Sequence, residues 1–251
     1  MRCSRTLATK RPASTSTIGC SAVIRLLDLL LSGTSILVLL PLLIPLAITL
    51  RFTGEGEVFF RQNRVGRGGE YFQLYKFATM LKDSPNMGSG TVTLKDDPRV
   101  LPLGHFLRRT KINELPQLLN IFVGDMSIIG PRPQTQRCFD AFPLESQYAI
   151  KQVRPGLSGI GSIIFRDEES LMTEAASASE FYDSVIMPYK GRLEEWFVAN
   201  RSISIYLKCI ALTVSSIAMP KRPIQLSNFK GLPKPPDALN RALRTTAGLE
   251  N

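Results

Sequence analysis

An uncharged apolar stretch from Leu29 to Leu50 constrains this chain more than any other feature. As an α-helix these 22 residues would reach about 33 Å, roughly the thickness of the hydrocarbon core of a bilayer. A secretory signal peptide has a shorter apolar core that is followed by a small-residue cleavage site, so the length disfavours that class of segment. The sequence therefore predicts a membrane helix near the start of the chain.

Two prolines near the middle of this stretch, Pro41 and Pro45, argue against a straight span, because each removes a backbone hydrogen bond and kinks a helix. Basic residues flank the stretch on both sides: Arg2, Arg5, Lys10, Arg11 and Arg25 before it, and Arg51, Arg61, Arg64 and Arg67 after it. Positive charge favours the cytoplasmic side of a membrane, so both flanks are expected there. We therefore predict a re-entrant helix hairpin over residues 22–50 that returns to the same face, with a straight span as the alternative.

The remaining chain divides by composition into a domain and two tails. Residues 1–21 are basic and rich in serine and threonine, which predicts a flexible cytoplasmic tail; a transit peptide is the competing interpretation. Residues 220–251 are rich in proline and lysine and are predicted to be disordered. Residues 51–219 are long enough for one domain of ordinary size and form the predicted catalytic domain.

Charge and metal-binding residue types narrow the function. Lysine and arginine outnumber the acids 31 to 21, which gives a net charge of +10 and favours an anionic partner: nucleic acid, lipid headgroups or a phosphorylated substrate. Four cysteines without paired spacing predict neither a disulfide framework nor a zinc site. His105 is the single histidine, so a His-rich metal centre is excluded and we expect His105 to be a packed or surface residue.

A basic hairpin follows the apolar stretch. Alternation predicts strands over Val58 to Arg61 and Tyr71 to Phe77, joined by a glycine-rich turn over Gly66 to Gly69. Four basic residues lie in it: Arg61, Arg64, Arg67 and Lys76. They suit either substrate phosphate binding or an electrostatic tether to anionic lipid.

The segment from Arg108 to Pro133, RRTKINELPQLLNIFVGDMSIIGPRP, concentrates charged and turn-forming residues. Thr110 or Asn113 is predicted to cap a helix, with Pro116 tolerated in its first turn. Its apolar positions follow helical spacing: Leu115, Leu118, Leu119, Phe122 and Val123. Glu114 would then lie at the positive end of the helix, a place that suits phosphate oxygens and a metal-bound carboxylate. The alternative is an ordinary capped amphipathic helix with solvated charges.

The later segments complete an α+β fold class, a small, mainly helical domain with a short β-hairpin or sheet. A short helix is predicted over residues 139–152 and a long helical region over residues 180–213. Between them, residues 153–171 predict a Pro-Gly turn, a glycine-rich strand and an acidic cluster. That cluster, Asp167, Glu168 and Glu169, is either the start of a solvated helix or a second source of metal ligands.

Several motifs in order carry a family resemblance. After the proline-broken membrane segment they read EVFFRQNRVGRGGEYFQLYKFATM, DPRVLPLGHFLRRTKINELPQLLNIFVGDMSIIGPRP, VRPGLSGIG and WFVANRSISI. From about Arg25 to Thr213 the chain resembles the bacterial sugar transferases of the monotopic phosphoglycosyl transferase type.

This resemblance implies that a sugar-1-phosphate moves from a UDP-sugar to polyprenyl (undecaprenyl) phosphate, with release of UMP, to start exopolysaccharide, O-antigen or glycoprotein glycan synthesis. It implies Mg²⁺ as cofactor, a re-entrant N-terminal helix, and a domain on the cytoplasmic face of the bacterial inner (plasma) membrane, in contact with its lipid. No nucleic-acid partner is expected. The C-terminal helix, with two aromatic faces, could support a homodimer.

Site residues follow from the matching motifs. Glu114 resembles the Mg²⁺-binding carboxylate, and Arg108 and Arg132 resemble the arginines that contact phosphate and nucleotide. Lys76 matches the lysine of the family's Lys-Phe-Arg-Thr-Met motif. The full predicted substrate- and phosphate-binding set is Arg64, Lys76, Arg108, Lys111, Arg132 and Pro133.

Three positions depart from the family pattern. Ala78 stands where the motif has arginine, Tyr206 lies near the position of an aspartate, and Asn113 precedes Glu114 where the family has an Asp-Glu pair. That aspartate is the family's nucleophile, and an amide is not a comparable nucleophile.

Three mechanisms can accommodate Asn113. Glu114 could attack, with Mg²⁺ held by Asp125 or Asp167. The lipid phosphate could attack the UDP-sugar directly, with Asn113 as a positioning donor. Alternatively, the chain could be a catalytically impaired scaffold or regulator of a polysaccharide assembly complex. We favour an active transferase without an adduct at residue 113, because the other charged residues are present.

Overall fold

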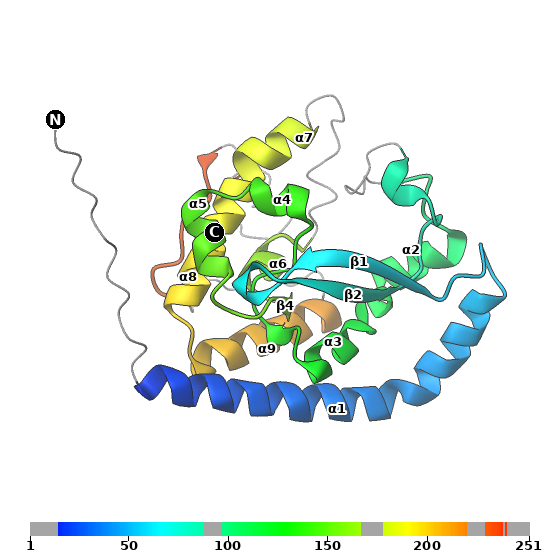
Figure 1. Cartoon of the computed structure of the whole chain (residues 1–251), viewed down its shortest axis with the longest axis horizontal. Coiled ribbons are helices and arrows are strands. Elements are labelled where there is room, and N and C mark those ends of the chain that lie inside the picture. The colour runs from blue at the N-terminus through cyan, green and yellow to red at the C-terminus, as the bar shows by residue number, and fades with distance from the viewer. Residues whose placement is uncertain (1–14, 88–96, 167–177, 220–228, 238, 240–251) are drawn as a thin grey trace.

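The computed structural model of the chain describes residues 15–87, 97–166, 178–219, 229–237 and 239. One long helix lies along a mixed domain of short helices and two small sheets (Figure 1). The strands are β1 (Phe59–Val65) and β2 (Tyr71–Phe77), an antiparallel pair, and β3 (Ser127–Ile129) and β4 (Gly156–Ser158), a parallel pair. The α-helices are α1 (Thr15–Arg51), α2 (Pro102–Arg109), α3 (Gln117–Val123), α4 (Gln136–Asp140), α5 (Leu144–Ile150), α6 (Ile160–Ile164), α7 (Ala178–Phe181), α8 (Met187–Ala199) and α9 (Ile203–Ala218).

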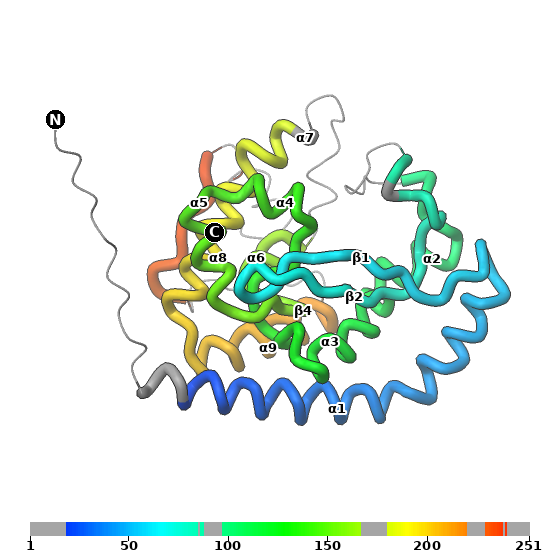
Figure 2. Tube along the Cα trace, viewed as in Figure 1, coloured from blue at the N-terminus to red at the C-terminus, as the bar shows by residue number. Residues whose placement is uncertain are grey.

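Helix α1 is continuous through Pro41 and Pro45, so the structure shows one helix where a hairpin was predicted. The tube in Figure 2 runs beneath the domain and bends toward β1 in its C-terminal part. The prolines are four residues apart and lie on one face of the helix, so their kinks add to a bend without reversing the chain. The helix also begins at Thr15, so residues 15–21 are not a flexible tail; residues 1–14 lie outside the described part.

Both ends of α1 pack against the same domain. Ile24 belongs to the main hydrophobic core, and Leu50 packs with Phe77 and Leu107 in a smaller cluster. Between them the buried Asp28 carboxylate accepts hydrogen bonds from Ser127 Oγ at 3.0 Å, Ile128 N at 2.8 Å and the Tyr206 hydroxyl at 2.7 Å. The opposite face of α1 is exposed and apolar, and residues 19–51 are long and apolar enough to cross a bilayer.

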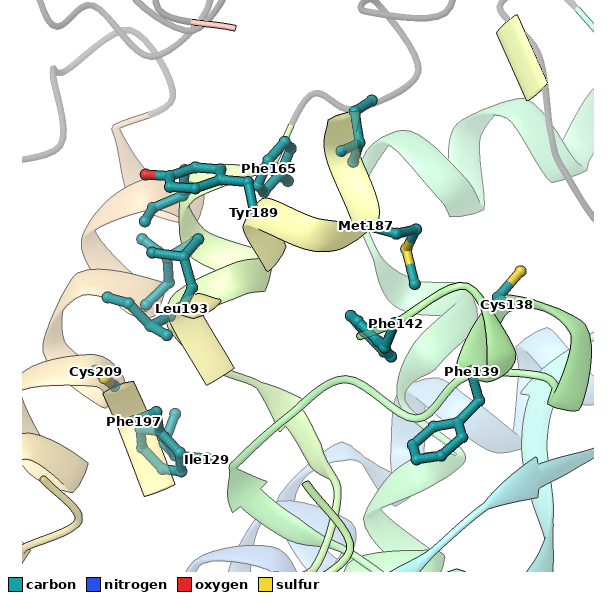
Figure 3. Packing of buried hydrophobic residues seen from close by; sticks show 14 of the residues in the cluster. Ile129, Cys138, Phe139, Phe142, Phe165, Met187, Tyr189, Leu193, Phe197 and Cys209 are labelled. Carbon is teal, nitrogen blue, oxygen red and sulfur yellow. The ribbon is translucent and has the colours of Figure 1, made fainter. Parts of the chain in front are cut away.

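The main core lies where α4, α6, α8 and α9 meet β3 (Figure 3). Phe139 and Phe142 contact edge to face at 5.9 Å between ring centroids, and Met187, Leu193 and Phe197 of α8 are buried in the same cluster. Burial of large apolar side chains on one face of each element stabilises these short helices, which would not persist alone.

The predicted basic hairpin is present. Strand β2 has the predicted bounds, whereas β1 extends further than predicted, to Val65. Gly68 at the turn has a φ of 74°, which favours glycine. Asn120 of α3 ties the hairpin to the domain, because its Oδ1 accepts from Tyr75 N at 3.1 Å and its Nδ2 donates to Gln73 O at 2.8 Å.

The predicted cap in the central segment is wrong. The Thr110 hydroxyl donates to Phe106 O at 2.8 Å in the preceding helix, and Asn113 is buried in a 3₁₀ turn over Ile112–Glu114. Lys111 has a left-handed φ of 60°, and α3 begins only after Pro116, without a side-chain cap. Glu114 therefore lies in a tight turn between α2 and α3, three residues before α3 begins, and not in the first turn of the predicted helix.

The C-terminal half differs from prediction where proline and glycine interrupt regular structure. The single helix predicted over residues 139–152 is two helices, α4 and α5, divided at Pro143. The glycine-rich strand is only three residues long and leads into α6. The long helical region contains a π-helical turn over Tyr182–Ile186 and breaks between Ala199 and Ile203.

Part of the tail predicted to be disordered packs against α8. Phe229 is buried and contacts Trp196 edge to face at 5.7 Å between ring centroids. The Trp196 Nε1–H donates to Lys230 O at 3.2 Å, and the Tyr189 hydroxyl donates to Pro233 O at 3.1 Å. Residues 229–237 therefore pack on the domain, because Trp196 and Tyr189 donate hydrogen bonds to their backbone and the Phe229 ring is buried.

Candidate functional site

Close glycine contacts fix the Gly-Pro-Arg-Pro loop that follows β3. A Cβ on Gly156 would lie 2.1 Å from Gly130 N, and a Cβ on Gly159 would lie 2.2 Å from Gly130 O. Only glycine allows β3 and β4 to approach so closely at this point. The loop therefore leaves the sheet in one defined direction, which carries Arg132 toward Glu114.

Glu114 forms the centre of the candidate site. Arg132 donates through Nη2 to Glu114 Oε1 at 2.5 Å and through Nη1 to Oε2 at 3.3 Å, so the pair is bidentate. Lys76 Nζ, from β2, lies 3.3 Å from Glu114 Oε1. Only 12% of the Glu114 side chain is exposed, so these contacts are largely shielded from water.

Electrostatics keep Glu114 ionised. Burial alone would raise the pKa of the Glu114 carboxyl, but Arg132 and Lys76 together outweigh it and hold that pKa well below its usual range. Burial lowers the pKa of the Lys76 ammonium to about 8, opposed by Glu114 and reinforced by Arg132 and Arg64. The carboxylate thus serves as a fixed negative charge among cations.

Arg64 of β1 adds a third cation. Its Nη1 donates to Pro133 O at 3.2 Å, which joins the hairpin to the Gly-Pro-Arg-Pro loop. Burial and then Arg132 lower the pKa of the Arg64 guanidinium to about 10, and its Nε is buried without a hydrogen-bond partner. Three cations surround one carboxylate, so the site carries an excess positive charge and suits a polyanionic ligand.

The other predicted substrate-binding residues lie around this centre. Pro133 is buried in the loop, and Lys111, although exposed, helps to lower the pKa of Glu114. Arg108 approaches Met80, with Nη1 3.8 Å from Sδ. Asn113 is buried directly before Glu114, and its Oδ1 has no hydrogen-bond partner among the residues that the structure describes.

The two additional acidic candidates do not join Glu114 in the described structure. Asp125 accepts from Asn120 Nδ2 at 3.2 Å beyond the C-terminal end of α3, whereas Glu114 precedes the N-terminal end of that helix. The seven residues of α3 therefore separate the two carboxylates along the chain. Asp167 lies outside the described residues, within which no group of three or more His, Cys, Asp or Glu side chains gathers.

The donor atoms next to each other in the 3₁₀ turn do fit Mg²⁺. Glu114 supplies a carboxylate and Asn113 supplies a buried amide oxygen that lacks a partner. Mg²⁺ prefers hard oxygen ligands and is often held by one or two protein groups together with substrate phosphates. If Mg²⁺ binds here, Glu114 and Asn113 are the residues whose chemistry fits it.

Gln117 was missed by the sequence reasoning. Its side chain is 1% exposed, and its Nε2 is buried without a hydrogen-bond partner. It follows Asn113 and Glu114 in the same sequence motif, which could have drawn attention to it. Its buried amide is a second polar group, at the start of α3, that is available to a ligand.

A cavity of about 600 Å³ lies between the C-terminal end of α1 and the hairpin. Its lining is mainly apolar and basic, with one acidic residue: Arg51, Gly56, Glu57, Val58, Phe59, Phe60, Arg61, Ala78, Met80 and Lys82. Ala78 follows Lys76 by two residues along the hairpin, and Met80 contacts Arg108. The cavity is therefore lined in part by residues that lie near the predicted phosphate-binding residues Lys76 and Arg108.

Comparison with known proteins identifies the family of this chain. The family profile described as bacterial sugar transferase matches residues 20–220. The chain is 37% identical over 140 residues to the UDP-N-acetylgalactosamine-undecaprenyl-phosphate N-acetylgalactosaminephosphotransferase of Aeromonas hydrophila, covering 55% of this chain and 33% of that protein. It is 34% identical over 157 residues to the UDP-glucose:undecaprenyl-phosphate glucose-1-phosphate transferase of Escherichia coli (strain K12), covering 61% of this chain and 34% of that protein.

A shorter relative matches over more of its length. The exopolysaccharide production protein ExoY of Rhizobium meliloti (strain 1021) is 31% identical over 171 residues, which cover 62% of this chain and 75% of that protein. The chain thus spans about a third of the Aeromonas and Escherichia proteins and three quarters of the Rhizobium protein. The match of the family profile to most of the chain confirms the resemblance seen in the motifs: this chain belongs to the bacterial sugar transferase family.

Proposed function

We propose that this protein transfers a sugar-1-phosphate from a UDP-sugar to polyprenyl phosphate and so starts the synthesis of an extracellular polysaccharide. The observation that carries the proposal is the largely shielded Glu114 carboxylate, which forms ion pairs with Lys76 and Arg132. Arg64 is a third cation near this pair of contacts. A nucleotide diphosphate donor and a lipid phosphate acceptor both bring negative charge to such a site. Names of relatives, which specify UDP-sugar:undecaprenyl-phosphate transfer, support the same reaction.

The cations would act on the reacting phosphates. Arg132 has a planar guanidinium that can move from Glu114 to phosphate oxygens, and Lys76 offers a compact charge beside it. During phosphoryl transfer negative charge spreads over the phosphoryl oxygens and onto the leaving UMP. Positive groups already fixed in place stabilise that charge without reorganisation of solvent.

We favour direct attack by the lipid phosphate. An oxygen of polyprenyl phosphate forms a bond to the sugar-linked phosphorus of the UDP-sugar while the bond to UMP breaks, which yields polyprenyl-diphosphate sugar and UMP. Asn113 cannot form a phospho-enzyme, and the ion-paired Glu114 carboxylate, with its lowered pKa, is a weak nucleophile. The amide of Asn113 can instead position a phosphate.

Mg²⁺ is part of this proposal. Glu114 and the amide oxygen of Asn113 would hold it together with donor phosphates. When bound, the ion would neutralise phosphate charge and polarise the bond to the leaving UMP.

The packing of α1 supports a site at the cytoplasmic face of the membrane. Ile24 and Leu50, 26 residues apart, both pack into a domain rich in charged residues. A helix tied to that domain at both ends could cross a bilayer only if the domain entered it, at a high cost in buried charge. We infer that α1 lies bent within one leaflet, with both of its ends on the side of the domain, and that the cavity beside Arg51 and Arg61 admits the acceptor.

The test is UMP release by the purified chain in detergent with polyprenyl phosphate, Mg²⁺ and a panel of UDP-sugars. At least one donor should give release that depends on the lipid phosphate, and Glu114→Gln and Lys76→Met should each lower it by about 10²-fold or more. Glu145→Gln, a matched change at an exposed carboxylate of α5, should not. Unaltered turnover in Glu114→Gln would show that the site is wrongly assigned.

The mechanism has its own test. With radiolabelled donor, the parent chain should retain no label on protein, whereas Asn113→Asp restores a carboxylate and can trap one. Label on the parent chain would contradict direct attack. Full polysaccharide output from cells that carry Glu114→Ala would favour the scaffold interpretation, which no relative's name supports.

A further inference from the structure

A second cluster of cations lies away from the Glu114 site. Four arginines from four separate segments form it: Arg25 of α1, Arg67 in the β1–β2 turn, Arg154 before β4 and Arg201 between α8 and α9. In Figure 1 the hairpin turn, the connection from α8 to α9 and the first part of α1 lie at the same end of the molecule, opposite α2. We call this set the arginine cluster.

Two members are anchored at the C-terminal end of α3. Arg25 donates through Nη1 to Ile121 O at 2.6 Å and through Nη2 to Phe122 O at 2.9 Å. Arg154 Nε donates to Gly124 O at 2.7 Å. Unpaired carbonyls at a helix end attract cations, so α3 holds both guanidinium groups at one place.

The other two members are brought there by the backbone. Gly68 N donates to Lys151 O at 2.8 Å, which fastens the hairpin turn beside the segment that carries Arg154. Arg201 reaches α1 through Nη1, 3.5 Å from Ser21 Oγ. Burial and then Arg25, Arg67 and Arg201 lower the pKa of the Arg154 guanidinium, as expected for like charges held close together.

Little negative charge compensates this cluster within the described residues. None of the four arginines forms an ion pair there. Asp28 is the acidic group that acts on Arg154 and Arg201, and its Oδ1 already accepts from Ser127, Ile128 and Tyr206. Four like charges that share one carboxylate, which is itself already hydrogen-bonded, repel one another, so the cluster has the electrostatics of an anion site.

The surroundings indicate which anion. Exposed apolar side chains border the cluster on the three helices that carry or flank it: Val23 and Leu26 of α1, Phe122 and Val123 of α3, and Ile203 and Leu207 of α9. A ligand that places a phosphate on the arginines and hydrocarbon on these side chains would use both features.

We propose that the arginine cluster is a binding site for the phosphate group of an anionic phospholipid, separate from the Glu114 site. This rests on the proposed membrane placement, in which the first part of α1 lies at the level of the lipid headgroups. The bound lipid would fix the hairpin turn, α1 and α9 relative to one another at the membrane surface. Arg67 is exposed, so it would be the first to contact the phosphate.

The experiment uses the full chain in a non-ionic detergent at constant ionic strength. Thermal unfolding is followed while a short-chain phosphatidylglycerol, a short-chain phosphatidylcholine or inorganic pyrophosphate is added. Phosphatidylglycerol should raise Tm in a saturable way, because a ligand of the folded state stabilises it by mass action. Phosphatidylcholine and pyrophosphate should raise it far less.

Variants locate the site. Arg67→Gln and Arg201→Gln should each weaken the apparent affinity for phosphatidylglycerol about tenfold, the loss typical of one charged hydrogen bond. Arg67→Lys, which keeps the charge, should retain most of the affinity. Arg192→Gln removes an equal charge from an exposed position of α8 outside the cluster and should have no effect.

Three results would overturn the proposal. Equal shifts with phosphatidylcholine would show no preference for anionic lipid, equal loss in Arg192→Gln would show a dependence on total charge only, and an equal shift with pyrophosphate would show a site for soluble phosphates. UMP release in detergent that contains polyprenyl phosphate and UDP-sugar but no phospholipid separates this proposal from the transferase reaction. Arg67→Gln should leave that release unchanged, and a chain without turnover can still show the lipid-dependent shift.

Discussion

Glu194 on α8 offers a sharp test of how charge is buried in this fold. Glu194 is 4% exposed, and the backbone N–H of Gly161 donates a hydrogen bond to its carboxyl group. Burial raises the pKa of the Glu194 carboxyl from 4.5 to about 8, opposed by Lys190 and by the Gly161 N–H. At neutral pH the folded protein therefore holds this group mainly protonated, whereas the unfolded chain holds it ionised.

This difference makes stability depend on pH in a defined direction. Between 4.5 and about 8 the folded state binds more protons at Glu194 than the unfolded state, so its contribution is largest at low pH and is lost as the pH rises. Linkage between these two pKa values gives a loss of about 2.5 kcal/mol in the free energy of unfolding from about pH 5.5 to about pH 7.5. Glu194→Gln keeps the size of the side chain and removes the titration, so the variant should lack this loss.

The assay is urea unfolding in a mild non-ionic detergent at the two pH values. Trp196, the only tryptophan in the chain, lies on the same helix and reports unfolding by fluorescence. The difference in free energy of unfolding between Glu194→Gln and the parent should rise by about 2.5 kcal/mol with pH, while Glu145→Gln, at an exposed carboxylate, should follow the parent. Parallel pH dependences for Glu194→Gln and the parent would refute the argument.

Three further predictions follow from packing. Gly156→Ala should lower the free energy of unfolding by about 3 kcal/mol and reduce turnover, because its Cβ would meet Gly130 N at 2.1 Å; an unchanged Tm would contradict this. Asp28→Asn and Tyr206→Phe should show a coupling of about 1–2 kcal/mol in a double-mutant cycle of urea unfolding, since their hydrogen bond is 2.7 Å and buried, and strict additivity would speak against it. Phe229→Ala should cost about 3 kcal/mol and speed proteolysis of the C-terminal segment, and equal cleavage rates would show that the segment is not held there.

Local patterns were sufficient for the elements that depend on nearby residues. The hairpin could be predicted because alternation and a glycine turn act within a few residues, and β2 has the predicted bounds. The apolar stretch after Asp28 likewise predicted a membrane helix, and residues 19–51 form a helix long and apolar enough to cross a bilayer, although the predicted hairpin is absent. The motifs around Glu114 and Arg132 were enough to identify the family, because they list the residue types in order along the chain.

The same local reasoning failed where distant segments decide the outcome. Thr110 and Asn113 are typical capping residues, yet one bonds back to α2 and the other is buried. Phe229 lies in a segment of disordered composition, yet α8 offers a pocket and hydrogen-bond partners for it. In both cases burial in the tertiary structure outweighs the conformational preference of the local sequence, which is worth about 1 kcal/mol.

By itself, the sequence determined the apolar helix, the basic hairpin and the identity of the charged residues, since these depend on spacing and on side-chain chemistry. Only the tertiary structure decided that α1 runs unbroken along the domain and that Lys76 and Arg132 converge on Glu114. It also gathered Arg25, Arg67, Arg154 and Arg201 at one end of the molecule. The physical reason is that charge interactions depend on distances in space, and the folding of separate segments sets those distances.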